Sequence, residues 1–179
     1  MGGQQEDDAG HETVIQINRE ERLWLLRNLA LGLVDYLGAL YPPIWIENIL
    51  KSPPAVYAGL FSKIRATNGD WSPIYERPIY QNGRTTRPWE LSIDERRYAI
   101  SREILIAVGG SAHGRAMGLP ELLLSHLEDC QDYFARVLLA PDPLIAAYRR
   151  QGKDLRGFAE TFLIPTRIAQ QRWEDSLFD

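Results

Sequence analysis

The sequence contains one cysteine, three histidines and no apolar run long enough to cross a bilayer, and each scarcity excludes a class of protein. A single thiol, Cys130, cannot form an internal disulfide, and the first residues lack the basic and apolar regions of a secretory signal. We therefore expect a cytoplasmic, reducing location. The longest apolar segment, residues 29–40, is too short for a membrane span and includes Asp35, so we expect no membrane partner.

Positive and negative charges balance outside the amino-terminal residues. The net charge is -4, and it comes from four acidic residues near the start, Glu6, Asp7, Asp8 and Glu12. Residues 1–13 are polar without apolar periodicity, which predicts a disordered acidic arm. Residues 14–179 are neutral in sum and rich in apolar residues, so we expect one domain with one core and no bulk attraction to nucleic acid.

Apolar periodicity predicts a mainly helical α+β domain. Apolar residues recur at three- and four-residue spacing in segments that we expect to be helices, namely residues 18–41, 42–50, 92–110, 119–139, 142–150, 155–162 and 165–173. Two of these segments begin with the spacing of a capping box, Asn18 with Glu21 and Ser92 with Glu95.

A small antiparallel sheet is expected between residues 53 and 88. This region holds proline, glycine and aromatic residues, and the pairs Asn68-Gly69 and Asn82-Gly83 are turn signals. The five tryptophans, at positions 24, 45, 71, 89 and 173, could form an aromatic contact surface, but we expect most of them in the core or at its edge.

Residues 97–106, Arg-Tyr-Ala-Ile-Ser-Arg-Glu-Ile-Leu-Ile, have the pattern of a zinc-binding helix without its two histidines. In an HExxH helix, residues i and i+4 share a face, so two imidazoles bind one zinc ion and the glutamate between them handles the attacking water. The aligned positions here are Arg102, Glu103 and Ile106. A cation and a hydrocarbon cannot donate electrons to zinc, so we expect no metal, no cofactor and no catalysis.

Further motifs make the chain resemble the ImmA/IrrE metallopeptidase family over about residues 20–175. The resemblance is carried by the Pro-Pro entry at 42–49, the lead-in to the zinc helix at 97–101, the Glu-x-x-Ala-Asn-x-Phe-Ala and Leu-Leu-Met-Pro signatures at 128–135 and 138–141, and the closing helix pair at 154–173. It implies a zincin-like fold. It also places Glu103 at the general-base position and Glu128 at the third zinc-ligand position, whereas Gln131 replaces the family's usual alanine.

The resemblance implies an inactive peptidase homologue that acts by binding. Active members of the family cleave or control helix-turn-helix repressors of mobile elements and stress responses, so the implied partner is a repressor-like protein. In place of zinc we expect an Arg102–Glu128 ion pair, because the arginine would neutralise a carboxylate left without its metal. In the alternative, Arg102 reaches solvent and Glu128 is a surface residue. The partner's identity and the oligomeric state are left open.

A relocated metal site is the first alternative function. Its ligands would come from Glu103, Glu128, His113 and His126, with Cys130 four residues after His126. Both His126 and Cys130 fall within an apolar helical stripe, which favours burial in the core over metal binding.

DNA binding is the second alternative. Residues 155–173 form a helix pair of helix-turn-helix appearance. Residues 143–173, which include this pair, have a local charge of +4, with the cations Arg149, Arg150, Lys153, Arg156, Arg167 and Arg172. Against DNA binding, the aromatic and aliphatic residues of the pair are expected to fasten it to the core: Phe158, Phe162, Ile168 and Trp173.

Overall fold

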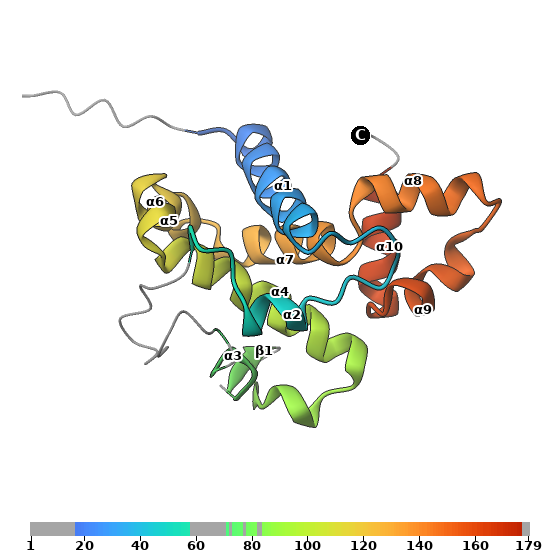
Figure 1. The fold of residues 1–179 in the computed structure, drawn as a ribbon, viewed down its shortest axis with the longest axis horizontal. Helices are drawn as coiled ribbons and strands as arrows, with labels where there is room; N and C mark the ends of the chain where they lie inside the picture. Colours follow the sequence, from blue (N-terminus) through green and yellow to red (C-terminus); the bar gives the residue numbers. More distant parts are fainter. Residues whose placement is uncertain (1–16, 58–70, 72, 77, 82–83, 177–179) are drawn as a thin grey trace, which may run out of the picture.

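The computed structural model describes residues 17–57, 71, 73–76, 78–81 and 84–176, which form a mainly helical fold, as predicted (Figure 1). The elements in chain order are α1 (Arg19–Tyr36), α2 (Glu47–Lys51), α3 (Pro73–Glu76), β1 (Ile79–Gln81), β2 (Arg84–Thr86), the 3-10 helix η2 (Pro88–Glu90), α4 (Ile93–Gly110), α5 (Ala112–Ala116), α6 (Leu119–Leu124), α7 (Leu127–Leu139), α8 (Asp142–Arg150), the 3-10 helix η3 (Leu155–Gly157), α9 (Phe158–Phe162) and α10 (Thr166–Asp175).

Helix α7 lies at the centre of the core. Helix α1 crosses one side of it, and α4 runs antiparallel to it on another side (Figure 1). From Cys130 to Leu139 almost every α7 side chain is buried, including Phe134 and Leu138, which are fully inaccessible. A helix that is apolar on most of its circumference is stable only when it is covered on several sides, and this explains its central position.

Helix α1 begins at the predicted capping box. The Asn18 side chain accepts a hydrogen bond from the Glu21 amide, and the Glu21 carboxylate accepts one from the Asn18 amide, both at 2.9 Å. The helix ends at Tyr36, earlier than predicted, because Gly38 adopts a left-handed conformation with φ of 61°. The Ala39 amide then bonds back to Val34 O at 3.3 Å, which closes the last turn.

Helix α4 begins after Ser92 and ends at Gly110, close to the predicted bounds. The predicted capping box at its start is wrong, because the Ser92 side chain makes no capping hydrogen bond. Glu95 instead accepts a 2.7 Å hydrogen bond from Arg167 of α10. A tertiary ion pair has therefore taken the carboxylate that the local motif would use.

The predicted helix over residues 119–139 is two helices. α6 and α7 are separated at Ser125 and His126. The backbone of His126 leaves the helical region, with φ of -144° and ψ of 34°. The four-residue spacing of Leu119, Leu123 and Leu127 continues across this break, so apolar periodicity alone could not reveal it.

Between α1 and α4, the residues that the structure describes are only partly helical or paired. The predicted helix at 42–50 is reduced to α2, and the Pro42–Pro43 peptide bond that precedes it is cis. β1 and β2 form an antiparallel ladder of three residues each, from Ile79 opposite Thr86 to Gln81 opposite Arg84. The predicted acidic arm and both predicted turn pairs lie outside the described residues.

Three of the five tryptophans differ from the prediction. Trp24, Trp45 and Trp89 are exposed, whereas Trp71 is buried and Trp173 is half-buried. In the part of the chain that the structure describes, no helix combines the length and apolarity that a membrane span requires.

Candidate functional site

Arg102 is at the first histidine position of the zinc-helix pattern predicted from the sequence, and its side chain binds α7. Its Nε lies 3.1 Å from Asp132 Oδ1, and its Nη2 donates to Gln131 Oε1 at 3.4 Å. The Gln131 amide group in turn donates to the Arg102 carbonyl oxygen at 3.3 Å. The approach to Asp132 lacks the alignment of a hydrogen bond, so it is chiefly a pairing of opposite charges at the α4–α7 interface.

The predicted Arg102–Glu128 ion pair is wrong. Glu128 is exposed in the first turn of α7, and the carboxylate that faces Arg102 belongs to Asp132, one turn later. The reason is the antiparallel packing of α4 and α7 (Figure 1). A residue one turn further along α4, Ile106, is at the level of Glu128, whereas Arg102 is at the level of Asp132.

Tyr98, one turn before Arg102 on α4, joins the same cluster. Burial of its ring and the negative charge of Asp132 raise the pKa of the phenol well above its ordinary value. The guanidinium of Arg167 lies 5.3 Å from the centre of this ring. The cluster therefore holds a neutral tyrosine, two arginines and a carboxylate.

The residues of the relocated metal site do not come together. His126 is exposed, contrary to the prediction that it lies in the apolar stripe, whereas Cys130 is buried as predicted. Burial raises the pKa of the Cys130 thiol, which disfavours the thiolate that a metal needs. His113 is exposed and packs against Tyr57, with ring centres 5.8 Å apart and ring planes tilted by 55°. Across the described ranges, no three His, Cys, Asp or Glu side chains gather closely enough to hold a metal ion.

Three of the six cations in residues 143–173 make contacts within the fold. Arg172 is fully buried, Arg167 pairs with Glu95, and the Arg149 guanidinium stacks 4.2 Å from the centre of the Trp173 ring. The predicted packing residues Phe158, Phe162 and Ile168 are buried. Half of the cations that would attract a phosphate backbone are thus engaged in contacts within the fold.

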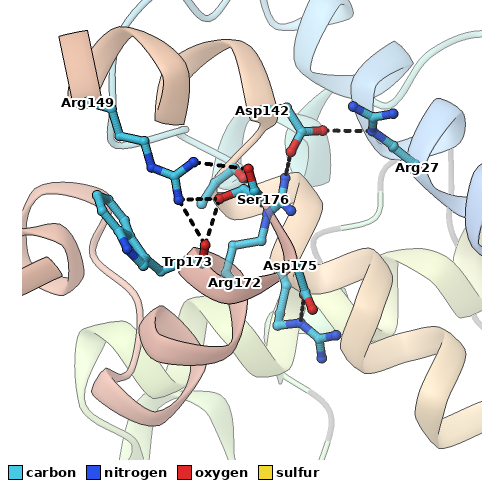
Figure 2. Close-up of polar contacts among 9 residues, drawn as sticks. Arg27, Asp142, Arg149, Arg172, Trp173, Asp175 and Ser176 are labelled. Carbon is cyan, nitrogen blue, oxygen red and sulfur yellow. Dashed lines mark hydrogen bonds and ion pairs between the residues drawn. The ribbon is translucent and has the colours of Figure 1, made fainter. Parts of the chain in front are cut away.

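The polar centre of this region is Asp142, at the start of α8 (Figure 2). Its two carboxylate oxygens bind different arginines, Arg27 of α1 at 2.7 Å and Arg172 of α10. Arg172 also donates to the Ala140 carbonyl at 2.8 Å. Burial opposes ionisation of Asp142, but the charge of Arg172 and the hydrogen bonds from both arginines outweigh it, so the pKa of Asp142 is below its ordinary value.

A second buried arginine, Arg97, connects three segments. Its guanidinium donates to the carbonyl oxygens of Ile44 and Leu163 and to the Glu47 carboxylate, at 3.2 Å from Oε2. Burial lowers the pKa of Arg97, and the nearby charge of Glu47 opposes this shift. The side chain therefore fixes the residues before α2 and the α9–α10 connection against α4.

Sequence reasoning missed the two fully buried arginines, Arg97 and Arg172, although a signal was present. Arg172 follows Ile168 and Ala169 at spacings of four and three, so it lies on the apolar stripe of α10. Arg97 is likewise followed by Ile100 and Ile104 on the buried face of α4. An arginine at a core position of an amphipathic helix is expected to satisfy buried carbonyl or carboxylate groups.

No protein-family model matches the chain, and neither the curated proteins nor the solved structures include a significant match to it. The zincin-like fold and the ImmA/IrrE resemblance therefore remain predictions.

Proposed function

We propose that this chain is a catalytically inactive, zincin-like domain of the ImmA/IrrE type that acts by binding a regulatory protein in the cytoplasm. The observation that carries the proposal is the environment of Arg102. A zinc-binding helix would present an imidazole at this position, and a guanidinium stands there instead, bound to Asp132 and Gln131 of α7. The cation compensates a carboxylate at the interface and at the same time occupies a ligand position.

The residues at the three family positions do not fit zinc. The Arg102 guanidinium has no lone pair to donate, Ile106 is a hydrocarbon, and Glu128 alone is a carboxylate, at the surface. Glu103, at the position of the general base, would have no metal-bound water to activate. We therefore derive no hydrolytic step and propose recognition of a repressor-like partner without cleavage.

Affinity capture with the full chain in its native host tests this function. We expect a repressor-like protein to co-purify at its full length, because Arg102 and Ile106 would hold no metal ion to activate water for its cleavage. The matched control is Glu103→Gln, which would trap an intact substrate in an active peptidase. Mass spectrometry of the captured protein decides the question: fragments with the natural chain and an intact partner with Glu103→Gln would establish an enzyme.

Restoring both histidines tests the scaffold. We expect the double variant Arg102→His, Ile106→His to retain about one zinc ion per chain after dialysis, because imidazoles at i and i+4 would then share the face of α4 that meets α7. Elemental analysis provides the measurement. A further Glu128→Ala change is expected to reduce zinc retention, and circular dichroism checks that each variant is folded. A folded double variant that binds no zinc would contradict the zincin-like geometry.

A further inference from the structure

Two adjoining hollows lie on the surface between the end of α1 and α8. The first, of about 380 Å³, is lined by residues that include Tyr41, Pro43 and Trp45. The second, of about 280 Å³, is lined by Tyr148 and Lys153 among others. Leu40, Tyr41 and Pro42 line both hollows, so the two lie beside the same short segment. We call this surface the Tyr41 groove, defined by Leu40, Tyr41, Pro42, Trp45, Tyr148 and Lys153.

The side chains at the rim of the groove are large, apolar and exposed. Relative exposure is 72% for Leu40, 80% for Tyr41 and 55% for Trp45. Three such residues beside a hollow mark a contact surface more strongly than scattered exposed leucines do. Tyrosine and tryptophan also supply most of the binding energy in protein interfaces, because they bury a large area at a small cost in side-chain entropy.

The groove is held in place by the core. The guanidinium of Arg97, fixed by buried carbonyl groups, lies 5.7 Å from the centre of the Trp45 ring. On the other side, the Tyr148 hydroxyl donates to the Asp154 carbonyl at 3.2 Å. A surface whose aromatic residues are fixed in advance loses less entropy when a partner binds.

The charge of the groove has one sign. Among the described residues that line the two hollows, Lys153 alone is charged, and its ammonium lies 5.1 Å from the centre of the Tyr148 ring. Arg150 and Arg156 are exposed in the neighbouring segment and form no ion pair within the described ranges. Asp154, which follows Lys153 in the chain, caps η3 by accepting a hydrogen bond from the Arg156 amide. One end of the groove therefore attracts a carboxylate.

We infer that the Tyr41 groove binds an extended segment of a partner protein in which apolar side chains are followed by aspartate or glutamate. The apolar side chains would fill the hollow beside Trp45, and the carboxylate would meet Lys153. Gln151 and Thr161, which also line the second hollow, can hydrogen-bond the peptide backbone. This inference rests on the proposed binding function and names the chemistry of the partner.

Selection from random peptides displayed on phage, with the full chain immobilised, tests the inference. We expect the enriched peptides to combine leucine, isoleucine or phenylalanine with aspartate or glutamate. Fluorescence anisotropy with one enriched peptide should then show binding at least about tenfold weaker for Tyr41→Ser and for Lys153→Glu. Both side chains are exposed, so these variants are expected to fold.

Matched controls separate a local effect from a general one. Trp24→Ser removes an equally exposed aromatic residue from α1, about three helical turns before the groove, and Arg84→Glu reverses an exposed charge on β2. Both are expected to bind the peptide within about twofold of the natural chain.

Several results would overturn the inference. They are no enrichment, enrichment without acidic residues, or equal binding by the natural chain and the Tyr41→Ser variant. A dimer that Tyr41→Ser dissociates in analytical ultracentrifugation would assign the groove to a second copy. Sedimentation with phosphatidylglycerol vesicles that Lys153→Glu abolishes would assign it to a lipid surface. The groove variants leave Arg102 unchanged, so the two proposals can fail separately. If peptide binding does not depend on the groove but an intact partner is captured, the groove alone is refuted. If the captured partner is cleaved, the proposed function alone is refuted.

Discussion

Replacing Arg172 by alanine is expected to lower the free energy of unfolding by about 3 kcal/mol, because it removes the buried member of an ion-pair cluster and leaves Asp142 with Arg27 as its remaining cation. The side chain is fully buried and donates to Asp142 and to the Ala140 carbonyl (Figure 2). Its loss would leave both acceptors without this donor in the interior. Urea denaturation followed by far-UV circular dichroism measures the change.

Two control variants separate buried charge from general loss of arginine. Arg156→Ala removes an exposed guanidinium from the neighbouring segment, and we expect its effect to be within about 0.5 kcal/mol. Arg172→Lys keeps the charge but loses the planar group that reaches both acceptors, so its stability should lie between those of the alanine variant and the natural chain. A loss below about 1 kcal/mol in Arg172→Ala would contradict the structural role.

The pH dependence of stability gives a second measurement of the same cluster. The pKa of Asp142 is lower in the folded chain than its ordinary value, so the unfolded chain takes up a proton first as the pH falls. The stabilisation is therefore complete well above the unfolded pKa of about 3.9 and is lost as the pH falls through the folded pKa. Asp142→Asn, which cannot ionise, should consequently be less stable than the natural chain at pH 7 and approach it under acidic conditions.

The helices could be predicted where one local signal dominates. Asn18 and Glu21 satisfy each other's backbone without help from the rest of the chain, so α1 starts where the sequence says. Ser92 and Glu95 have the same spacing, but Arg167 is 72 residues away in sequence and competes for the same carboxylate. Local spacing cannot report a partner that only the tertiary fold brings near.

In the candidate site, Arg102 of α4 could be predicted from the sequence, whereas its partner on α7 could not. Arg102 was singled out by its position in the zinc-helix pattern that the sequence was predicted to resemble, and the need for an opposing carboxylate followed from its charge. The identity of that carboxylate depends on how far α7 is shifted along α4, which neither helix encodes alone. The Tyr41 groove was less predictable still, because its hollows join residues more than one hundred positions apart, such as Tyr41 and Lys153.

A substitution at Gly114 is expected to change the free energy of unfolding about as much as one at Arg172. In α5, its missing side chain leaves room for the end of α4: a methyl group at this position would overlap the Val108 carbonyl oxygen and lie 2.9 Å from that of Gly109. These are backbone atoms of a packed helix and cannot rotate away. We expect Gly114→Ala to lower the free energy of unfolding by about 3 kcal/mol, at the upper end of the overpacking range, as measured by urea denaturation.

Gly32→Ala is the matched control, since it makes the same chemical change in a helix where the space is open. No atom lies within 4 Å of the methyl group that would be added at this exposed position in α1. Alanine there lowers the conformational entropy of the unfolded chain, so we expect a gain of about 0.5–1 kcal/mol. The two substitutions should therefore change stability in opposite directions. Equal effects at both positions would show that α5 does not turn back so closely on the end of α4.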